Sequence, residues 1–464
     1  MNDSNRYGKS TGGSRRMIRT IVTALAVGLF GIVTLAPPGQ AADLSELLRS
    51  FKQKQQEAAS VDAAPPLSRE EAAQIWDAFL TAVVKRAGQD SGQEELRDDL
   101  LALLLDQRYE IVETLATATV DGPPWLAAQF GSSWERLAPL LDRVAAQLPP
   151  EAAANYKRLL DSGRILDAAR ARGWIDANAT SPAALRELAQ VILPKGAPDP
   201  LAYDTAVDPQ FRAIFGFEDP LPPIEPTALL GGGPLADFGP LGLLARIAEG
   251  AGNWLIPTAN AASSGWDWHQ LVTRLNNFVP GGKSELGEYL PMVREMLDGT
   301  AHTLAARRLP PEHFEVYRDL VVTTAWQESC WRQYEKRAGQ VEPVRGPGPS
   351  LGLMQVNTRV WRGVYDTKGV TSDIGYNARA GAEILYTYLR KHALRAKEHL
   401  VSGGEDNLAR ASWAAYNGGP GHLRRYRKAE TSPHLKSVDT EFWQKFQAVE
   451  RGDESAFFSC AVKG

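Results

Sequence analysis

The chain has 464 residues, and its 44% hydrophobic content is enough for the cores of two or more domains. Its formal net charge of −4 argues against nonspecific binding to nucleic acid. The two cysteines and seven histidines show neither CxxC nor HExxH spacing, so we expect no metal site and no cofactor.

The N-terminus has the layout of a secretory signal. Three arginines precede an uncharged run at residues 20–36, and small residues follow up to Ala42. We therefore expect a signal peptide at residues 1–41, cleaved after Ala41, and a periplasmic protein. The alternative is an uncleaved membrane anchor through residues 20–36, because this run is at the lower limit of length for spanning a bilayer.

Residues 43–216 show helical periodicity throughout and are expected to form a separate α-helical N-terminal domain. Three helix starts are predicted at serines in N-cap contexts: Ser68 with Glu71, Ser132 with Glu135, and Ser181 with Pro182. Residues 217–265 are rich in proline and glycine and are expected to form a linker. Helical periodicity then resumes from residue 266 to the end, and no run predicts a major sheet, so the fold class is mainly α.

Glu328 stands where the apolar stripe of a predicted helix runs into a carboxylate. The stripe is formed at three- and four-residue spacing by Phe314, Tyr317, Val321 and Thr324. A desolvated carboxylic acid that stays neutral is what a general acid requires near neutral pH. The alternative is a structural acid paired with an arginine, since ion pairs also shift pKa values.

Three further segments accompany Glu328-Ser329: Gly352-Leu353-Met354-Gln355, the stretch at residues 377–382, and Ala414-Ala415-Tyr416-Asn417-Gly418-Gly419-Pro420. In this order and within about a hundred residues, they resemble the catalytic domain of the soluble lytic transglycosylases, which is similar to glycoside hydrolase family 23. The resemblance covers roughly residues 310–430. It implies a lysozyme-like α-helical domain within residues 266–464.

The resemblance also implies the chemistry. Glu328 would protonate the glycosidic oxygen between N-acetylmuramic acid and N-acetylglucosamine in peptidoglycan, and then act as base on the 6-hydroxyl to give a 1,6-anhydro sugar. This reaction needs one carboxylic acid, and the next acids, Glu335 and Glu342, are predicted in a polar loop. The alternatives are a lysozyme-type hydrolase on the same fold and a noncatalytic cell-wall scaffold or binding protein.

The expected substrate-binding residues are Ser329, Ser350, Met354, Gln355, Tyr416 and Asn417. By resemblance, Tyr416 orients the acid and Gln355 bonds a sugar polar group, while Met354 packs near the floor of the site. For Ser329, a structural hydroxyl is the alternative. Ser350 is placed only provisionally, because the stretch between Glu328 and Gly352 is longer than is usual in the family.

Two groups of residues near these motifs have a structural and a functional interpretation. Three tryptophans are expected in the core, with sugar stacking as the alternative: Trp326, Trp331 and Trp361. Four basic residues are expected on a solvated face, with binding of substrate carboxylates as the alternative: Arg424, Arg425, Arg427 and Lys428.

Cys330 and Cys460 are compatible with one disulfide in an oxidising compartment, the alternative being two unpaired thiols. As partners we expect peptidoglycan glycan strands, no nucleic acid, and a component of a cell-wall machine bound through the N-terminal domain. We expect the protein to be a monomer.

Overall fold

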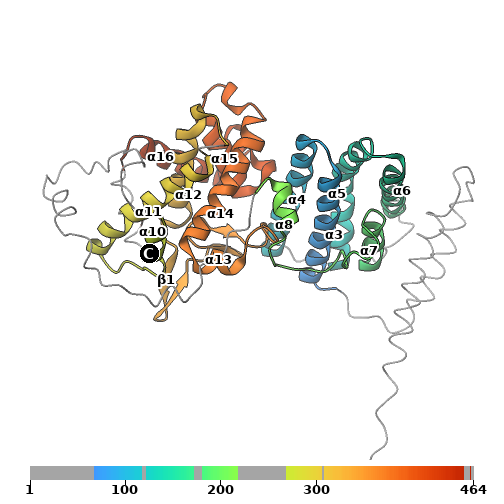
Figure 1. Ribbon diagram of the computed structural model, residues 1–464, viewed down its shortest axis with the longest axis horizontal. Helices are drawn as coiled ribbons and strands as arrows, with labels where there is room; N and C mark the ends of the chain where they lie inside the picture. The colour runs from blue at the N-terminus through green and yellow to red at the C-terminus, as the bar shows by residue number, and fades with distance from the viewer. Residues whose placement is uncertain are drawn as a thin grey trace, which may run out of the picture. The chain divides into compact units, whose positions relative to one another are not determined.

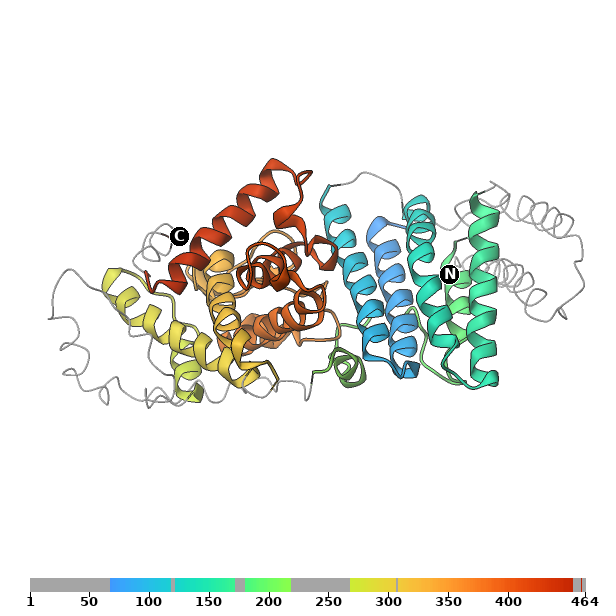
Figure 2. The same cartoon turned by 90° about the horizontal axis from the view of Figure 1, so that it is seen from above.

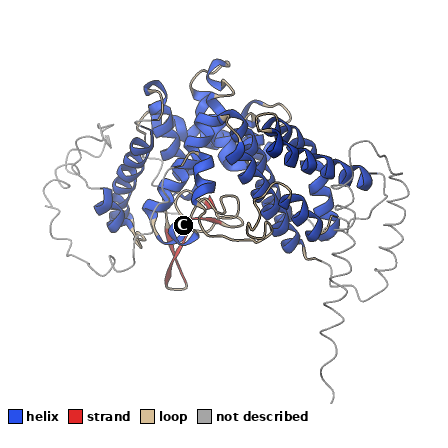
Figure 3. Cartoon of the chain, turned by 45° about the vertical axis from the view of Figure 1, so that its right-hand side comes forward, coloured by secondary structure: helices blue, strands red, loops and turns tan. Residues whose placement is uncertain are grey.

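The computed structural model describes residues 67–117, 122–171, 180–217, 268–305, 308–453 and 460. These residues are mostly helical and include only four short strands, which confirms the mainly α fold class (Figure 3). Residues 1–41 and nearly all of residues 217–265 lie outside the described part, so the signal peptide and the linker stay predictions. No helix among the described residues is both long and apolar enough to cross a membrane.

The chain divides into two compact units, Met1–Tyr203 and Asp204–Gly464 (Figure 1). The first unit contains α3 (Arg69–Asp90), α4 (Glu94–Thr117), α5 (Gly122–Ala145), α6 (Pro150–Ala171) and α7 (Pro182–Gln190). Helix α3 packs against α4, α5 and α7, and α5 also packs against α6 (Figure 2). The core of this unit holds stacked aromatic rings and a buried ion pair between Asp77 and Arg108.

Two of the three predicted helix starts in this unit are confirmed. Ser68 and Glu71 form a reciprocal capping box, and Ser181 accepts a hydrogen bond from the Ala184 N–H at the start of α7. The start at Ser132 is wrong, because α5 already begins at Gly122 and runs through this position. The buried residues Trp125, Leu126 and Phe130 extend the apolar face upstream, so Ser132 lies in mid-helix.

The second unit is built around α12 (Phe314–Ser329), which packs against helices from four other parts of the unit. Its neighbours are α11 (Lys283–Ala305), α14 (Ile374–Thr387), α15 (Asp406–Gly418) and α16 (Pro433–Glu450) (Figure 1). The shorter α-helices are α8 (Pro209–Phe215), α10 (Trp268–Leu275) and α13 (Thr367–Ser372). There are also 3-10 turns at Pro311–His313, Glu398–Leu400, Pro420–His422 and Arg425–Arg427. A π-helical turn, Tyr388–Leu394, continues α14.

The strands of this unit form two small antiparallel pairs. Strand β1 (Tyr334–Arg337) pairs with β2 (Gln340–Pro343), and β3 (Ser350–Leu351) pairs with β4 (Val356–Asn357). The predicted polar loop with Glu335 and Glu342 is therefore a β-hairpin, in which these two residues lie opposite each other. The hairpin was missed because its exposed strands lack the apolar alternation that marks a half-buried sheet.

Residues 204–217 pack on the second unit, although the sequence placed residues 43–216 in one N-terminal domain. The Asp208 N–H donates to the Gly363 carbonyl over 2.8 Å, and Phe215 packs against Trp361 with ring centroids 5.5 Å apart. Helical periodicity shows that a segment has an apolar face but not which unit that face contacts. The expected domain limits and the observed division therefore differ at this segment.

Candidate active site

Glu328 lies in the last turn of α12, after an apolar stripe that is buried except at Phe314, which is half-buried. Tyr317, Val321 and Thr324 have no exposed surface, whereas Glu328 remains half-buried. Burial raises the pKa of the Glu328 carboxyl to about 8, and the positive charge of Lys445 opposes that shift. At neutral pH this side chain is thus mostly a neutral acid with access to solvent.

The helix ends sharply after Glu328. Cys330 and Trp331 both adopt left-handed backbone conformations, with φ of 55° and 59°, and their N–H groups return to the carbonyls of Trp326 and Ala325. Neither residue is glycine, so the strained turn must be held by its surroundings.

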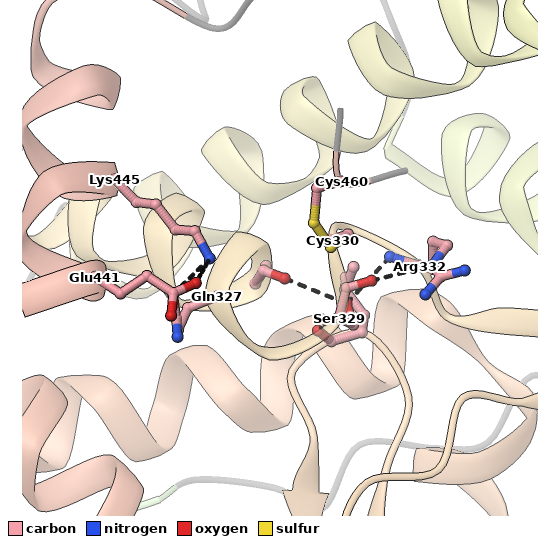
Figure 4. Close-up of a disulfide and its surroundings, with 9 residues drawn as sticks. Gln327, Ser329, Cys330, Arg332, Glu441, Lys445 and Cys460 are labelled. Atoms are coloured by element: carbon pink, nitrogen blue, oxygen red, sulfur yellow. Dashed lines mark hydrogen bonds and ion pairs between the residues drawn. A yellow bond between two sulfur atoms is a disulfide. The ribbon is translucent and has the colours of Figure 1, made fainter. Parts of the chain in front are cut away.

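Two contacts hold this turn in place. The buried Trp331 ring donates its Nε1–H to the Val322 carbonyl over 3.0 Å. Cys330 forms a disulfide with Cys460, with the Cα atoms 5.8 Å apart, which ties the C-terminal tail to the end of α12 (Figure 4). The position of Glu328 is therefore fixed by contacts of the residues that follow it in the chain.

Ser329 connects the end of α12 to the Gly352–Gln355 segment. Its buried hydroxyl donates to the Leu353 carbonyl over 2.6 Å and accepts the Arg332 N–H over 3.1 Å (Figure 4). The geometry favours the structural interpretation of this hydroxyl, because both of its strong hydrogen bonds are made to backbone groups.

Two buried amides hold the Gly352–Gln355 segment. Gln333 accepts the Leu353 N–H, and Asn377 accepts the Met354 N–H, each over 2.8 Å. Gly352 has φ of 76°, and a Cβ atom there would collide with both amide side chains. Asn377 was noted as part of a motif, but Gln333 was missed, since a glutamine outside the recognised motifs carries no signal of its own.

Gln355 presents a buried acceptor. Its Nε2 donates to the carbonyls of Gly352 and Val344 over 2.8 and 3.2 Å, while its Oε1 has no hydrogen-bond partner among the described residues. Gly346 lies directly beside this oxygen, and a Cβ there would collide with it. A buried carbonyl oxygen without a donor is costly, so an N–H or O–H group from a ligand would satisfy it.

Tyr416, on α15, contacts the same segment. Its hydroxyl donates to the Met354 carbonyl over 2.5 Å, and the fully buried Met354 side chain packs against Gly381 of α14. Tyr416 therefore braces the Gly352–Gln355 segment at Met354. Direct orientation of Glu328 by Tyr416 stays a prediction.

Asn417 and three of the four basic residues after it take part in hydrogen bonds or ion pairs, and the expectation of a solvated face was wrong for Arg425 alone. Arg425 is buried, donates to the Asn417 Oδ1 over 3.0 Å, and pairs with Asp439. Arg424 and Arg427 bind Glu398, a residue with no exposed surface. Burial alone would raise the Glu398 pKa, but hydrogen bonds from Arg427, Tyr426 and Arg424 lower it overall. Arg424, Arg427 and Lys428 are exposed, as expected of a solvated face.

The remaining sequence candidates have more limited roles in the structure. Ser350 is half-exposed in β3 and accepts the Gly346 N–H through its carbonyl. Trp326, Trp331 and Trp361 are all buried, in line with core packing. The described residues contain no group of three or more His, Cys, Asp or Glu side chains arranged to hold a metal ion.

Comparison with protein families identifies residues 311–437 as a match to the transglycosylase SLT domain. Searches among curated proteins and among solved structures found no match. The family match confirms the resemblance drawn from the four motifs. It runs from the turn before α12 to the first residues of α16, so α8, α10, α11 and most of α16 lie outside it.

Proposed function

From the transglycosylase SLT domain at residues 311–437, we propose that this protein is a peptidoglycan lytic transglycosylase with Glu328 as its catalytic acid and base. The observation that carries the proposal is the state of Glu328. It is half-buried, has a pKa of about 8, and forms no ion pair with a described residue. A structural acid in this position would need a partner, whereas a general acid needs its proton.

In the first step, the Glu328 carboxyl gives its proton to the glycosidic oxygen as the bond to the muramic acid C1 breaks. The sugar then carries oxocarbenium-like charge, and Glu328 is left as a carboxylate. In the second step, the carboxylate takes the proton of the 6-hydroxyl, whose oxygen closes on C1. The result is a 1,6-anhydro end, a new 4-hydroxyl on the leaving sugar, and a reprotonated Glu328.

The segment Gly352–Gln355 is proposed to position the sugar. Gln355 Oε1, buried and without a donor, suits the N–H of an N-acetyl group. Met354, held by Tyr416, would form the apolar floor. Ser350 and Asn417 are proposed to contribute polar contacts at the edge of the same site, whereas Ser329 supports the segment from behind.

Two broader proposals rest on the sequence. The basic, apolar and small-residue order of residues 1–41 supports secretion to the periplasm. The helical first unit lies wholly outside the family match and is proposed to bind a component of a cell-wall machine, in a protein that acts as a monomer.

The test is mass spectrometry of purified peptidoglycan digested with the protein from Ala42 onward. We expect anhydromuropeptides from the wild type, none from Glu328→Gln, and unchanged products from the control Glu335→Gln in the exposed hairpin. Hydrated reducing ends would instead indicate a lysozyme-type hydrolase. Binding to peptidoglycan without any product would indicate a noncatalytic scaffold.

A further inference from the structure

We propose that Lys445, on α16 beyond the family match, is a positioning residue that acts on Glu328 by holding a fixed positive charge beside it. The inference rests on the proposed function of Glu328. It adds to the catalytic machinery a residue from the part of α16 that lies beyond the family match.

The ammonium group of Lys445 is held at the last turn of α12. Its Nζ donates to the Gln327 Oε1 over 2.6 Å and pairs with the Glu441 Oε1 over 2.8 Å (Figure 4). Gln327 is the residue directly before Glu328. The Lys445 side chain is 17% exposed, so its charge is much less screened than that of a surface lysine.

A third contact comes from the same turn. The Nζ of Lys445 lies 5.5 Å from the centre of the Trp326 ring, within the range of a cation–π interaction. Trp326 is buried, so it offers a rigid face to the charge. Contacts from α12 and from α16 itself thus place this cation.

The arrangement suits an acid that must also become a base. Lys445 forms its ion pair with Glu441 and not with Glu328, so the nearby charge favours the Glu328 carboxylate without trapping it in a salt bridge. Desolvation alone would hold the proton too tightly for transfer to the glycosidic oxygen. The fixed cation weakens that hold and stabilises the carboxylate formed between the two steps.

Several other charged side chains on the elements around α12 have described partners of their own. These pairs are Arg294 with Asp298 on α11, Glu383 of α14 with Arg212, Arg410 of α15 with the rings of Tyr426 and Trp443, Arg318 with Asp319 on α12, and Glu405 with His313 beside the start of α12. Arg332, after the helix, donates to the Ser329 carbonyl. Lys445 is the charged group whose field lowers the pKa of Glu328.

The first experiment is the pH profile of kcat/KM for anhydromuropeptide release by the full chain from Ala42. In the wild type, the rate should fall as pH rises through the Glu328 pKa. Lys445→Met should move this fall upward by about 0.5 to 1 pH unit, because the opposing charge is gone. Lys445→Arg, which keeps the charge, should restore the wild-type profile.

Glu441→Gln is the matched control, because it removes a charge of the opposite sign from the same cluster. Glu441 is exposed, with 56% of its side-chain surface accessible, so this variant should fold normally. It should move the fall in rate downward by a few tenths of a pH unit, since Lys445 then acts unopposed. The inference would be overturned if the variants had a lower kcat or a higher KM but the pH at which kcat/KM falls were the same in all of them.

A second readout does not depend on activity. The difference in Tm between Glu328→Gln and its Glu328 parent changes with pH wherever the folded protein keeps the Glu328 proton and the unfolded chain has lost it. Adding Lys445→Met to both proteins should extend this change to higher pH. If the wild type makes no anhydro product, the proposed function fails, and this measurement still decides whether Lys445 acts on Glu328.

Discussion

Two glutamates on neighbouring helices of the second unit, Glu328 and Glu383, differ in how their burial is compensated. Burial raises the pKa of both carboxyls. Glu383, on α14, has a side chain 5% exposed and lies 3.2 Å from the guanidinium of Arg212, which is itself 1% exposed. Glu328, on α12, is half-buried and forms no ion pair among the described residues.

The two carboxyls therefore differ as a structural acid differs from the acid we propose as catalytic. Arg212 also donates to the Val364 carbonyl and stacks on Phe217 and Tyr365, so the Glu383 pair joins α8 to the centre of the unit. A buried charge with a good partner contributes to the fold and is unavailable to a substrate. A desolvated acid that solvent can reach, with a cation near but not paired, keeps a transferable proton.

The largest expected effect is the loss of catalysis in Glu328→Gln. Removing the general acid should lower the rate of muropeptide release by about 10²- to 10⁴-fold, while the Tm does not fall. Glu383→Gln should do the reverse, with a lower Tm and near-normal activity per folded molecule. Rates at a temperature well below both Tm values, normalised to folded protein, test the comparison. Equal losses of activity in the two variants would end the distinction.

Arg212→Met should destabilise the second unit by about 3 kcal/mol, because it leaves the Glu383 carboxyl buried without its partner. Calorimetry of the full chain, with hydrogen exchange at residues 374–387, would show the loss and its location. Arg212→Met combined with Glu383→Leu should recover part of the stability. No change in exchange around α14 would contradict the assignment of α8 to this unit.

The pH dependence of stability should distinguish Glu328 from an ordinary surface glutamate. Its folded pKa of about 8 lies above the unfolded value of 4.5, so the folded state holds an extra proton between these limits. Its contribution to stability therefore falls as pH rises from about 4.5 to about 8. Glu328→Gln should be more stable than the wild type at pH 9, by at most about 5 kcal/mol for a pKa difference of this size, and equal to it at pH 4. The control Glu335→Gln should show no such trend.

The smallest expected effect concerns the turn behind Glu328. Ser329→Ala removes the hydrogen bond to the Leu353 carbonyl and should cost about 1 kcal/mol. Ser350→Ala, at a half-exposed site, should leave stability unchanged and raise KM if the hydroxyl contacts the sugar. Thermal denaturation and steady-state kinetics of the two variants would separate the supporting serine from the proposed binding serine. A KM effect confined to Ser329→Ala would reverse these roles.

Much of the site could be predicted because its residues are close in sequence or lie in short motifs. The apolar stripe that ends at Glu328 is a property of one helix, and Gly352 and Asn377 belong to short segments that resemble motifs of a known family. Gln333, which accepts the Leu353 N–H, was not predictable in this way. Nor was the burial of Arg425 on Asp439, because a run of basic residues has the same local pattern whether it faces solvent or distant acids.

The sequence by itself determined the mainly α class, the helix that carries Glu328, the order of the four motifs, and the capping box at Ser68. These depend on periodicity and short-range spacing, which one helix or turn expresses alone. Only the tertiary structure decided that Arg212 neutralises Glu383 across 171 residues and that Lys445 of α16 stands beside Gln327. Such pairs depend on which surfaces pack together. The position of a charged residue in the sequence does not show which distant residue it will contact.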